Sequence, residues 1–566
     1  MYTLENIITQ TKGAIEKACG LELEQSMLSE PPSSELGDLS TSIAFKLAKK
    51  EKKSPVETAK EILKKLGNPD LIKKVSAAGP YINFYIDWEK AGKQVLEEAM
   101  SQEYASSDEG KGKWIVIDYS SPNVAKPMHI GHLRSTIIGD SIHRMYKHLG
   151  YSVHRVNHIG DWGVPFGKLI AAYKKWGDEK ELEKDPIHYL VGLYVKYNQA
   201  EEENPPLKQE AVEWFKKLEA GDPEAKELWE KFKVLSIQKF EEVYQELEVE
   251  FDSYKGEAYY ALNELTNKIV EEALEKGVAV EEEPGTIIVP LEEYGLVNAR
   301  LVENKRTLYI TRDLAAAKER WEEFKFKKNL YIVAVEQEEH FKQLRKVLEL
   351  MGYGWWQDCV HVKFGMMSLP EGRISTRKGK YIELKQVLDL AVEKANKIIE
   401  EKNPSLKHKE ETAKSVGIGA VKFADLSQNR IKNIVFDPDK MVSFEGDTGP
   451  YLQYAHVRCC SILEKAEDVQ EMTVNMSGLN PVEVELVKKL AKFPEIVKDA
   501  AHKQEPHRIA QYLLDLAHQF SAFYESTPVL KAEGTKKGRR IAMVKATENV
   551  LRIGLDLLGI QAPEKM

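Results

Sequence analysis

The stretch SSPNVAKPMHIGHLRST, residues 120–136, decides the fold that this sequence predicts. It follows WIVIDY (114–119), a compact run of residues that favour strands, and it leads into a helical pattern from about His129 to Leu149, which Gly150 ends. YSVHRVNHI (151–159) predicts another strand. Strand, loop, helix and strand in this order are typical of one βαβ half of a doubly wound parallel sheet.

Two histidines, His129 and His132, open the predicted helix, with Gly131 between them. Residues three apart in a helix lie on the same face. A helix N-terminus favours anions because its backbone N–H groups and its dipole point toward them. Imidazoles added there can donate hydrogen bonds to triphosphate oxygens as charge develops at the α-phosphorus, and Gly131 leaves room for a flat base. The turn therefore predicts a nucleotide-phosphate site, and the alternative is a pair of surface or capping histidines.

A second α/β block follows between about residues 300 and 384, after a long stretch of charged helices with proline breaks. Its predicted elements are a strand at TLYIT (307–311), a helix through LAAAKERWEEF (314–324), a strand at NLYIVAV (329–335), a helix at EEHFKQLRKVLELM (338–351) and a strand at CVHVKF (359–364). Two such halves make one open sheet, and ligands of such sheets bind at the carboxyl ends of the strands.

The regions on either side of this α/β core differ from it. The first part combines helical patterns with a short strand, YINFYI at 81–86, and the polar stretch 101–113 predicts a linker. Beyond residue 384 the pattern is nearly all helical. We predict an α+β N-terminal domain at 1–110, an α/β catalytic domain at 111–385 with a helical insertion at about 168–300, a connecting helical segment at 386–445, and an all-α domain at 446–566.

Composition narrows the class of protein. The chain has 566 residues, of which 42% are hydrophobic and 30% charged, as in ordinary globular proteins with several domains. No apolar run approaches the roughly 20 residues of a membrane span, and the N-terminus lacks a signal-peptide pattern. The net charge of −9 excludes a generally basic surface but not a local nucleic-acid site. We expect a cytoplasmic monomer that binds no membrane.

SSPNVAKPMHIGH resembles the first signature of class I aminoacyl-tRNA synthetases, and most specifically that of the arginyl branch. The resemblance extends over essentially the whole chain. It implies a Rossmann-type catalytic domain that activates L-arginine with ATP and transfers it to the 3′-terminal ribose of tRNA(Arg), with release of pyrophosphate and AMP. It also implies pyrophosphate exchange that requires tRNA. The expected ATP contacts are Pro127, His129, Gly131, His132, His340, Phe364 and Met366.

A second class I signature is similar to GRISTRKGKYIEL (372–384), but RISTR (373–377) stands where Lys-Met-Ser-Lys-Ser is expected. The second lysine is therefore absent, and losing a donor that acts mainly in a transition state can cost ~10²–10³ in rate. Lys126 is the first candidate to replace it, because arginyl enzymes with this degenerate loop typically have a lysine there. The predicted catalytic set is Lys126, His129, Gly131, His132, Ser375, Arg377 and Lys378, with the last two as alternatives to Lys126.

A pocket for arginine needs carboxylates and carbonyl oxygens in planar, bidentate geometry around the guanidinium. Candidate acids near strand ends are Asp118, Asp313 and Glu336. Asp313 is favoured because TLYITRDLAAA resembles the family segment whose Tyr and Asp hold the substrate side chain, although a capping role for Asp313 is the alternative. We expect NHIGDWG (157–163) to line the same cleft as His340. The predicted arginine-binding set is Asp118, Asn123, Tyr309, Asp313 and Gln337.

Both flanking domains are expected to bind tRNA. GDTGPYLQYAHVRCCSIL (446–463) is similar to the helical anticodon-binding domain of the family, in which aromatic side chains can stack on unpaired bases. KAEGTKKGRR (531–540) predicts a phosphate-contacting patch, whereas Phe520 and Phe523 suit a helix core better. In GPYINF, Tyr81 and Asn83 match residues that read a D-loop base, with a simple buried strand as the alternative. The predicted tRNA contacts are Tyr81, Asn83, Tyr454, Arg458 and Met566.

Cofactor expectations are few. Mg²⁺ should accompany ATP, held largely by phosphates, so no protein ligand is named. Cys19, Cys359, Cys459 and Cys460 form no CxxC motif, so no structural zinc is expected, nor any organic cofactor. Three alternatives stay open: a class I synthetase for another amino acid, a nucleotidyltransferase that uses a related H-x-G-H site without tRNA, and a tRNA-binding protein with an inactive site.

Overall fold

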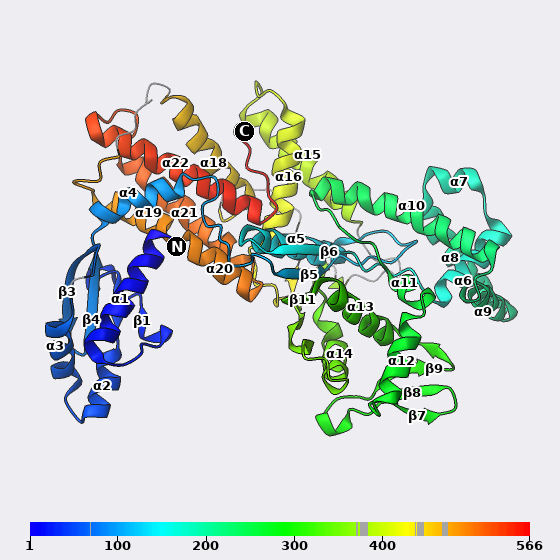
Figure 1. The fold of residues 1–566 in the computed structure, drawn as a ribbon. Helices are drawn as coiled ribbons and strands as arrows, with labels where there is room; N and C mark the ends of the chain where they lie inside the picture. Colours follow the sequence, from blue (N-terminus) through cyan, green and yellow to red (C-terminus); the bar gives the residue numbers. More distant parts are fainter. Residues whose placement is uncertain (68, 370–371, 374–382, 436, 438–445, 467–473) are drawn as a thin grey trace.

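The computed structural model describes residues 1–566 except 68, 370–371, 374–382, 436, 438–445 and 467–473. A parallel sheet lies at the centre of the molecule, and the N-terminal unit and the helical insertion lie at opposite ends (Figure 1). The C-terminal helices fill the space between the N-terminal unit and the central sheet (Figure 1). In the described part of the chain, no helix is long and apolar enough to cross a membrane.

The N-terminal unit is a four-stranded antiparallel sheet in the order β1-β2-β4-β3. YINFYI forms β4 as predicted, and Phe84 in its middle is fully buried. The last helix of this region packs instead on two C-terminal helices, α19 and α22. The elements are α1 (Thr3–Cys19), β1 (Leu28–Ser29), β2 (Leu39–Thr41), α2 (Ile43–Glu51), α3 (Pro55–Lys65), β3 (Ile72–Ala78), β4 (Tyr81–Ile86) and α4 (Trp88–Ala99).

The central sheet has the order β12-β11-β5-β6, and all its pairs are parallel. Its two central strands, β5 and β11, are largely buried, and helices connect the parallel strands, which confirms the predicted doubly wound fold. Its elements and crossover helices are β5 (Trp114–Asp118), α5 (Ile130–His148), β6 (Ser152–Val156), α13 (Tyr309–Phe324), β11 (Lys328–Tyr331), α14 (Glu338–Leu350) and β12 (Cys359–His361).

The insertion contains helices, as predicted, and also a sheet that the sequence did not predict. β7–β10 form an antiparallel sheet in the order β10-β9-β8-β7, and three glutamates, Glu281–Glu283, hide the strand pattern. The elements are α6 (Val164–Trp176), α7 (Glu179–Lys184), α8 (Pro186–Glu203), α9 (Pro206–Glu219), α10 (Pro223–Leu247), α11 (Glu257–Leu262), α12 (Leu265–Glu275), β7 (Val280–Glu283), β8 (Thr286–Val289), β9 (Ala299–Glu303) and β10 (Arg306–Thr307).

The predicted strand TLYIT is wrong. Only Thr307 of it belongs to a strand, and Tyr309 begins α13, since Leu308 is extended and serves as the N-cap residue. Thr311 N–H then donates to the Leu308 carbonyl. The strong helix formers after Asp313 extend the helix toward the N-terminus, and four apolar-patterned residues are too few to oppose them.

The C-terminal half is nearly all helical, as predicted, apart from a small sheet in the order β14-β13-β15. Phe520 and Phe523 are buried in its core, so the core interpretation of these two residues is confirmed. The elements are β13 (Met367–Leu369), β14 (Gly372–Arg373), α15 (Leu384–Lys402), α16 (Lys409–Leu426), β15 (Ile434–Val435), α18 (Gly449–Glu464), α19 (Pro481–Ala491), α20 (Phe493–Lys503), α21 (His507–Ser526) and α22 (Gly534–Leu557).

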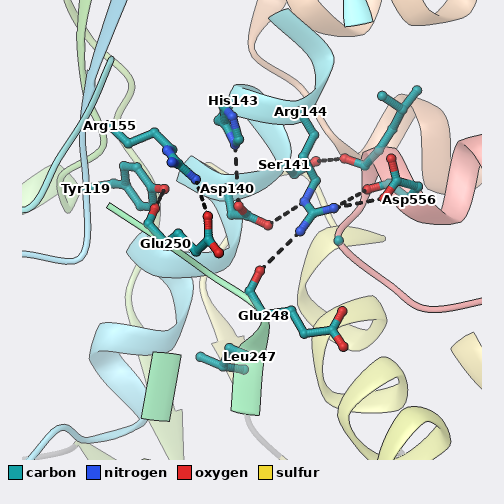
Figure 2. A network of polar contacts seen from close by, with 12 residues as sticks. Tyr119, Asp140, Ser141, His143, Arg144, Arg155, Leu247, Glu248, Glu250 and Asp556 are labelled. Atoms are coloured by element: carbon teal, nitrogen blue, oxygen red, sulfur yellow. Dashed lines mark hydrogen bonds and ion pairs between the residues drawn. The ribbon is translucent and has the colours of Figure 1, made fainter. Parts of the chain in front are cut away.

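The C-terminal end of α5 is anchored by a network of charged groups (Figure 2). Arg144 Nε donates to Asp140 Oδ2 at 2.8 Å, Nη1 donates to Asp556 Oδ1 at 2.9 Å, and Nη2 donates to the Glu248 carbonyl at 3.1 Å. The buried Lys422 donates to the carbonyls of Leu247 and Gly559. These groups, the α5 junction, join the catalytic sheet, the insertion and the C-terminal helices.

Candidate active site

The two histidines of HIGH lie at the N-terminus of helix α5 and also cap it. His129 is the N-cap residue, and its Nδ1 accepts a hydrogen bond from the Gly131 N–H at 3.0 Å. His132 Nδ1 accepts in turn from the His129 N–H at 3.1 Å, which completes a capping box. The ring centroids lie 4.0 Å apart. The capping interpretation and the functional one are therefore compatible.

This capping fixes the tautomers of both imidazoles. Because each Nδ1 accepts a hydrogen bond, the proton of each neutral ring lies on Nε2. Burial is the main cause, and the positive charge of Lys126 a smaller one, that lowers the pKa of His129 to about 4 and that of His132 to about 3. Both rings are thus neutral at pH 7, and each offers one Nε2–H donor at the start of the helix.

Two glycines provide room for predicted site residues. A Cβ on Gly131 would lie 2.7 Å from Cε1 of His129, so the glycine lets that ring fold over the helix start. A Cβ on Gly160 would lie 2.3 Å from Oδ1 of Asn123, which is exposed and pairs with Gly160 in a parallel bridge. Gly160 of the NHIGDWG segment thus determines the position of Asn123.

The second signature falls mostly outside the described residues, which include neither Ser375 nor Arg377 nor Lys378. The residues that follow it are described and lie against the histidine pair. Glu383 forms a bridge with His129, and Leu384 N–H donates to the Met128 carbonyl at 2.9 Å. Lys126 is exposed in the turn that precedes α5.

Asp313 lies in a cluster of rings from different parts of the chain. His340 Nε2 and Asp313 Oδ2 are 2.6 Å apart, and His158 Nε2 lies 3.9 Å from the other carboxylate oxygen. The Tyr309 ring packs on His340, with centroids 4.6 Å apart. Burial alone would raise the pKa of Asp313, but the hydrogen bond and charge of His340 hold that pKa below its ordinary value. Asp313 does not cap α13, whose N-cap residue is Leu308.

Asp118 differs from Asp313 because its carboxylate already forms an ion pair with an arginine of the protein. Arg320 Nη2 donates to Asp118 Oδ2 at 2.8 Å, and Ser121 Oγ donates to Oδ1 at 3.2 Å. Both side chains of the ion pair are buried. The expectation that Asp118 offers an open carboxylate to a substrate is therefore corrected: it supports the wall of the cleft.

Sequence reasoning missed Glu257, the first residue of α11. Its Oε2 lies 3.4 Å from Arg312 Nη2. Burial raises its pKa although the charges of Arg312 and His158 oppose this, and Asp313 adds a smaller repulsion, so a second carboxylate lies near this cluster. In the sequence, the glycine that precedes Glu257 could have pointed to it. The structure shows why a glycine stands there: a Cβ on Gly256 would lie 2.6 Å from Asp161 Oδ1, so the backbone passes close to that carboxylate.

Two of the remaining candidates for ATP, Phe364 and Met366, lie on the segment between β12 and β13. Phe364 is buried, and its carbonyl accepts from the Val335 N–H at 2.9 Å. Met366 is 37% exposed, and its N–H donates to Asn433 Oδ1 at 2.8 Å. Pro127 is partly exposed beside the histidine pair, and the exposed Gln337 precedes α14. His340, assigned to ATP from the sequence, lies with Asp313 instead.

Comparisons with known proteins agree with this geometry. The family model "tRNA synthetases class I (R), catalytic domain" matches residues 94–438, "Arginyl tRNA synthetase N terminal domain" matches 5–86, and "DALR anticodon binding domain" matches 452–566. The chain belongs to the arginyl-tRNA synthetase family.

Individual relatives of this synthetase span its whole length. The arginine–tRNA ligase of Alkaliphilus metalliredigens is 45% identical over 545 residues, 95% of each chain, and that of Streptococcus pneumoniae is 45% identical over 570 residues, 100% of each. The structure titled Thermus thermophilus arginyl-tRNA synthetase has a TM-score of 0.83 at 26% identity, covering 99% of this chain and 100% of the other. The predicted fold, class of enzyme and arginine specificity are thereby confirmed, against all three alternatives.

The N-terminal tRNA candidates of this synthetase differ in accessibility. Tyr81 is 46% exposed at the start of β4, and its ring packs nearly perpendicular to Phe45, with centroids 5.5 Å apart. Asn83 is buried, and its Oδ1 accepts from Ser40 Oγ at 2.7 Å. The structure thus leaves the Tyr81 ring half-exposed, whereas the Asn83 side chain ties β4 to β2.

The C-terminal candidates lie on or near α18. Tyr454 is 50% exposed, and the Arg458 guanidinium stacks over the Tyr524 ring at 4.3 Å. The Met566 carbonyl accepts from Asn403 Nδ2 at 3.1 Å.

The expected basic patch at 531–540 is smaller than its sequence indicates. Arg539 and Arg540 both bind the buried Glu483, at 2.8 Å each, so neither is available to phosphates. Only Lys531, Lys536 and Lys537 remain from that patch.

One group of side chains has the composition of a metal site. His456, Cys460 and Glu548 bring their ligand atoms within 4.8 Å of one another. However, His456 Nδ1 already bonds the Pro563 carbonyl at 2.9 Å, and its Nε2 bonds Glu548 at 3.2 Å. The pKa of His456 is raised to about 9 against the effect of burial, largely by Cys460 and Glu548. This group is an ion pair that fastens the C-terminal segment to α18.

Proposed function

We propose that this chain joins L-arginine to tRNA(Arg) in two steps, through arginyl-adenylate, at the cleft between the histidine pair and the Asp313 cluster. In the first step a carboxylate oxygen of arginine attacks the α-phosphorus of ATP, and pyrophosphate leaves. In the second step a hydroxyl of the 3′-terminal ribose attacks the arginyl carbonyl, and AMP leaves. The observation that carries the proposal is the pair of neutral Nε2–H donors at the N-terminus of α5.

The histidine pair acts on the phosphates. His129 and His132 donate through Nε2 to oxygens that gain charge at the α-phosphorus, while capping keeps both rings in place and oriented. Lys126 supplies the positive charge that the degenerate second signature lacks. This group of side chains consists of hydrogen-bond donors and a cation, without an oxygen ligand for a metal. Mg²⁺ would therefore be held by the phosphates, whose negative charge it neutralises.

The Asp313 cluster selects arginine. A guanidinium requires planar acceptors, and Asp313 is ionised and held by His340, with Glu257 close enough to share the substrate's charge. Tyr309 closes one side over His340. We propose that Asn123, whose position Gly160 determines, holds the α-amino group or the carboxylate of arginine. We propose that the exposed Gln337 contacts the side chain of the substrate. Lysine would present a point charge and would use only part of this geometry.

The flanking domains address the tRNA. We assign the elbow to the N-terminal domain through Tyr81, and the anticodon loop to the C-terminal helices through Tyr454, Arg458 and Met566. The exposed rings of Tyr81 and Tyr454 support stacking on unpaired bases. The predicted boundaries at residues 110, 385 and 445, a monomeric state and a cytoplasmic location remain part of this proposal.

Charging assays test the proposal directly. Purified enzyme should transfer arginine to tRNA, and none of the other nineteen standard amino acids at a comparable rate. Exchange of pyrophosphate into ATP should require tRNA(Arg) as well as arginine. Transfer of another amino acid in preference to arginine would contradict the assignment of the Asp313 cluster.

A further inference from the structure

Arg134 is a fully buried arginine on α5, five residues after His129. Its guanidinium binds the last turn of α16 and the segments that follow β12 and α16. Nε lies 3.0 Å from Asp425 Oδ2. Nη1 donates to the Gly365 carbonyl at 2.6 Å and to the Lys432 carbonyl at 3.0 Å.

The Arg134 contacts continue along the same two segments. Nη2 donates to the Arg430 carbonyl at 3.2 Å, and the guanidinium carbon lies 5.7 Å from the centre of the Phe364 ring. One side chain of α5 thus binds residues that lie more than 230 positions away along the chain. A buried guanidinium without such acceptors would be strongly destabilising, so these segments must keep their positions around it.

The two segments are also paired tightly with each other. Gly365 N–H donates to the Arg430 carbonyl at 2.8 Å, and Ile434 N–H donates to the Met366 carbonyl at 3.0 Å. A Cβ on Gly365 would lie 2.5 Å from the Lys432 carbonyl oxygen, so no other residue fits there without a shift. The segment 364–367, which leads into β13, is therefore bonded along its length to residues 430–434.

We propose that Arg134 is a positioning residue for ATP, which fixes the segment 364–367 relative to the histidine pair on the same helix. The inference rests on the proposed contacts of Phe364 and Met366 with ATP. The phosphates meet His129 and His132 at the N-terminus of α5, and the nucleoside meets the segment that Arg134 holds. One rigid helix therefore sets the distance between the two halves of the substrate, and small misplacements of reacting groups can cost about 10²-fold in rate.

The planar fork of arginine is essential to this role. Its N–H groups reach one carboxylate and three carbonyls in fixed directions, whereas the ammonium of lysine is a compact charge with three donors. Arg134→Lys keeps the charge opposite Asp425 and loses part of the carbonyl contacts. The segment 364–367 should then shift relative to α5, while Asp313 and His340, which lie on α13 and α14, stay in place.

A second buried arginine supplies a matched control. Arg539 is 2% exposed, and it binds Glu483 at 2.8 Å and the carbonyls of Ser477 and Gly478 at 2.6 and 3.0 Å. The chemistry matches that of Arg134, but Arg539 lies on α22, and none of the proposed ATP contacts lies on the segments it binds. A purely structural role would make Arg134→Lys and Arg539→Lys behave alike.

The experiment compares steady-state arginine charging by these two variants, with thermal unfolding measured on each. Arg134→Lys should raise KM for ATP about 10-fold and lower kcat, with KM for arginine within about twofold. Arg539→Lys should lower the unfolding midpoint to a similar degree and leave both KM values unchanged. Equal effects of Arg134→Lys on the two KM values, or unchanged kinetics beside a lowered midpoint, would overturn the inference.

A milder variant decides the matter if Arg134→Lys does not fold. Asn433→Ala removes the exposed partner of the Met366 N–H and should raise KM for ATP about threefold, again without an effect on arginine. An unchanged KM for ATP in that case would overturn the inference. Met366→Ala distinguishes a failure of the proposed ATP contact from a failure of the positioning role of Arg134. If it leaves KM for ATP unchanged, the proposed ATP contact fails and the inference fails with it, whereas a raised KM beside a silent Arg134→Lys refutes the inference alone.

Discussion

The two ends of helix α5 are built in opposite ways. At the N-terminus, His129 and His132 keep their Nε2–H groups, and among the residues that the structure describes none accepts from either. At the C-terminus, Arg144 uses Nε, Nη1 and Nη2 on groups from three parts of the chain. The N-terminus of α5 therefore keeps hydrogen-bond donors for a ligand, whereas the donors of Arg144 at the C-terminus all bind groups of the protein.

This difference separates function from stability on one element. An unpaired donor at a helix start is tolerable only if water or a ligand completes it, whereas the α5 junction is complete without a ligand. Changes at the first end should therefore affect the reaction, and changes at the second end should affect folding. The following predictions test that separation.

The largest effect should come from His132→Glu. Glutamate and glutamine both satisfy the acceptor that a capping box requires at this position, so both variants should fold normally. Glutamate, however, turns a carboxylate toward the phosphates, and arginine activation should fall about 10³-fold. His132→Gln keeps an amide donor and should lose less, about 10²-fold. Single-turnover formation of arginyl-adenylate measures both, and equal losses would show that capping alone matters.

Lys126→Ala should reduce activation about 10²-fold, because it removes the charge that we propose replaces the missing lysine of the second signature. Folding and tRNA binding should persist, since the side chain is exposed. The exposed Lys111 provides a control, and Lys111→Ala should leave the rate unchanged. Unchanged activation by Lys126→Ala would transfer this role to Arg377 or Lys378.

At the other end, Arg144→Met should destabilise α5 locally by about 2–3 kcal/mol, because it leaves the buried Asp140 without its main cation. Amide hydrogen exchange in the last turns of α5 should become about 30- to 150-fold faster. The rate of arginine activation should change less than about threefold at temperatures well below unfolding. A loss of activation comparable to that of His132→Gln would abolish the distinction between the two ends.

Acidification should weaken the histidine end first. The folded-state pKa values of His129 and His132, about 4 and 3, lie below the ordinary 6.5. The unfolded chain thus binds more protons below pH 6.5, and stability falls as pH drops from there toward 4. The slope is at most about 1.4 kcal/mol per pH unit for each ring, less because both are partly exposed. His132→Gln should therefore show a shallower decline in unfolding midpoint between pH 7 and 4.5.

The junction responds at lower pH. Burial raises the pKa of Asp140, but His143, Arg144 and Lys422 outweigh it and lower that pKa to about 2. Its folded-state pKa lies below the ordinary 3.8, so its contribution is present above that pH and is lost as pH falls through 2. If the unfolding midpoint of His132→Gln fell with pH as steeply as that of the unmodified enzyme down to pH 4.5, the histidine end of α5 would not be the first to respond to acid.

The smallest effect should come from Asp556→Asn. This carboxylate is 67% exposed, and exposed ion pairs contribute little because water screens them. Arg144 keeps Asp140 and the Glu248 carbonyl, so the change should stay below about 0.5 kcal/mol in the same exchange experiment. A loss as large as that of Arg144→Met would mean that the surface pair, and not the buried one, holds the junction.

The sequence predicted most reliably what local pattern determines. The unit β5–α5–β6 is specified by two apolar runs, a capped helix and Gly150, all within about 45 residues. Asp313 was predicted as a site residue because the segment TLYITRDLAAA resembles a family motif. The strand predicted for the first part of that segment is instead the start of a helix. A short apolar pattern is compatible with either element, and the residues after it decided the outcome.

What the sequence could not predict depends on partners far along the chain. Asp118 was taken for an open carboxylate because its cation, Arg320, lies 202 residues away. The arginines of KAEGTKKGRR were taken for a phosphate patch because Glu483 lies more than 50 residues before them. Glu257 was overlooked inside a charged helical region because only the fold brings it beside Asp313.

The α5 junction also sets an order of events during synthesis. Asp556 follows Arg144 by 412 residues, so a ribosome moving at about 5–20 residues per second needs on the order of 20–80 s to supply it. For that interval the catalytic helix exists without its last anchors, with charged groups meant for burial still in water. A chain released before residues 556–559 would carry the complete histidine motif on a helix whose far end lacks the Asp556 and Gly559 contacts and keeps those with Asp140 and the Glu248 carbonyl. Premature termination therefore yields a product that proteases and chaperones can recognise.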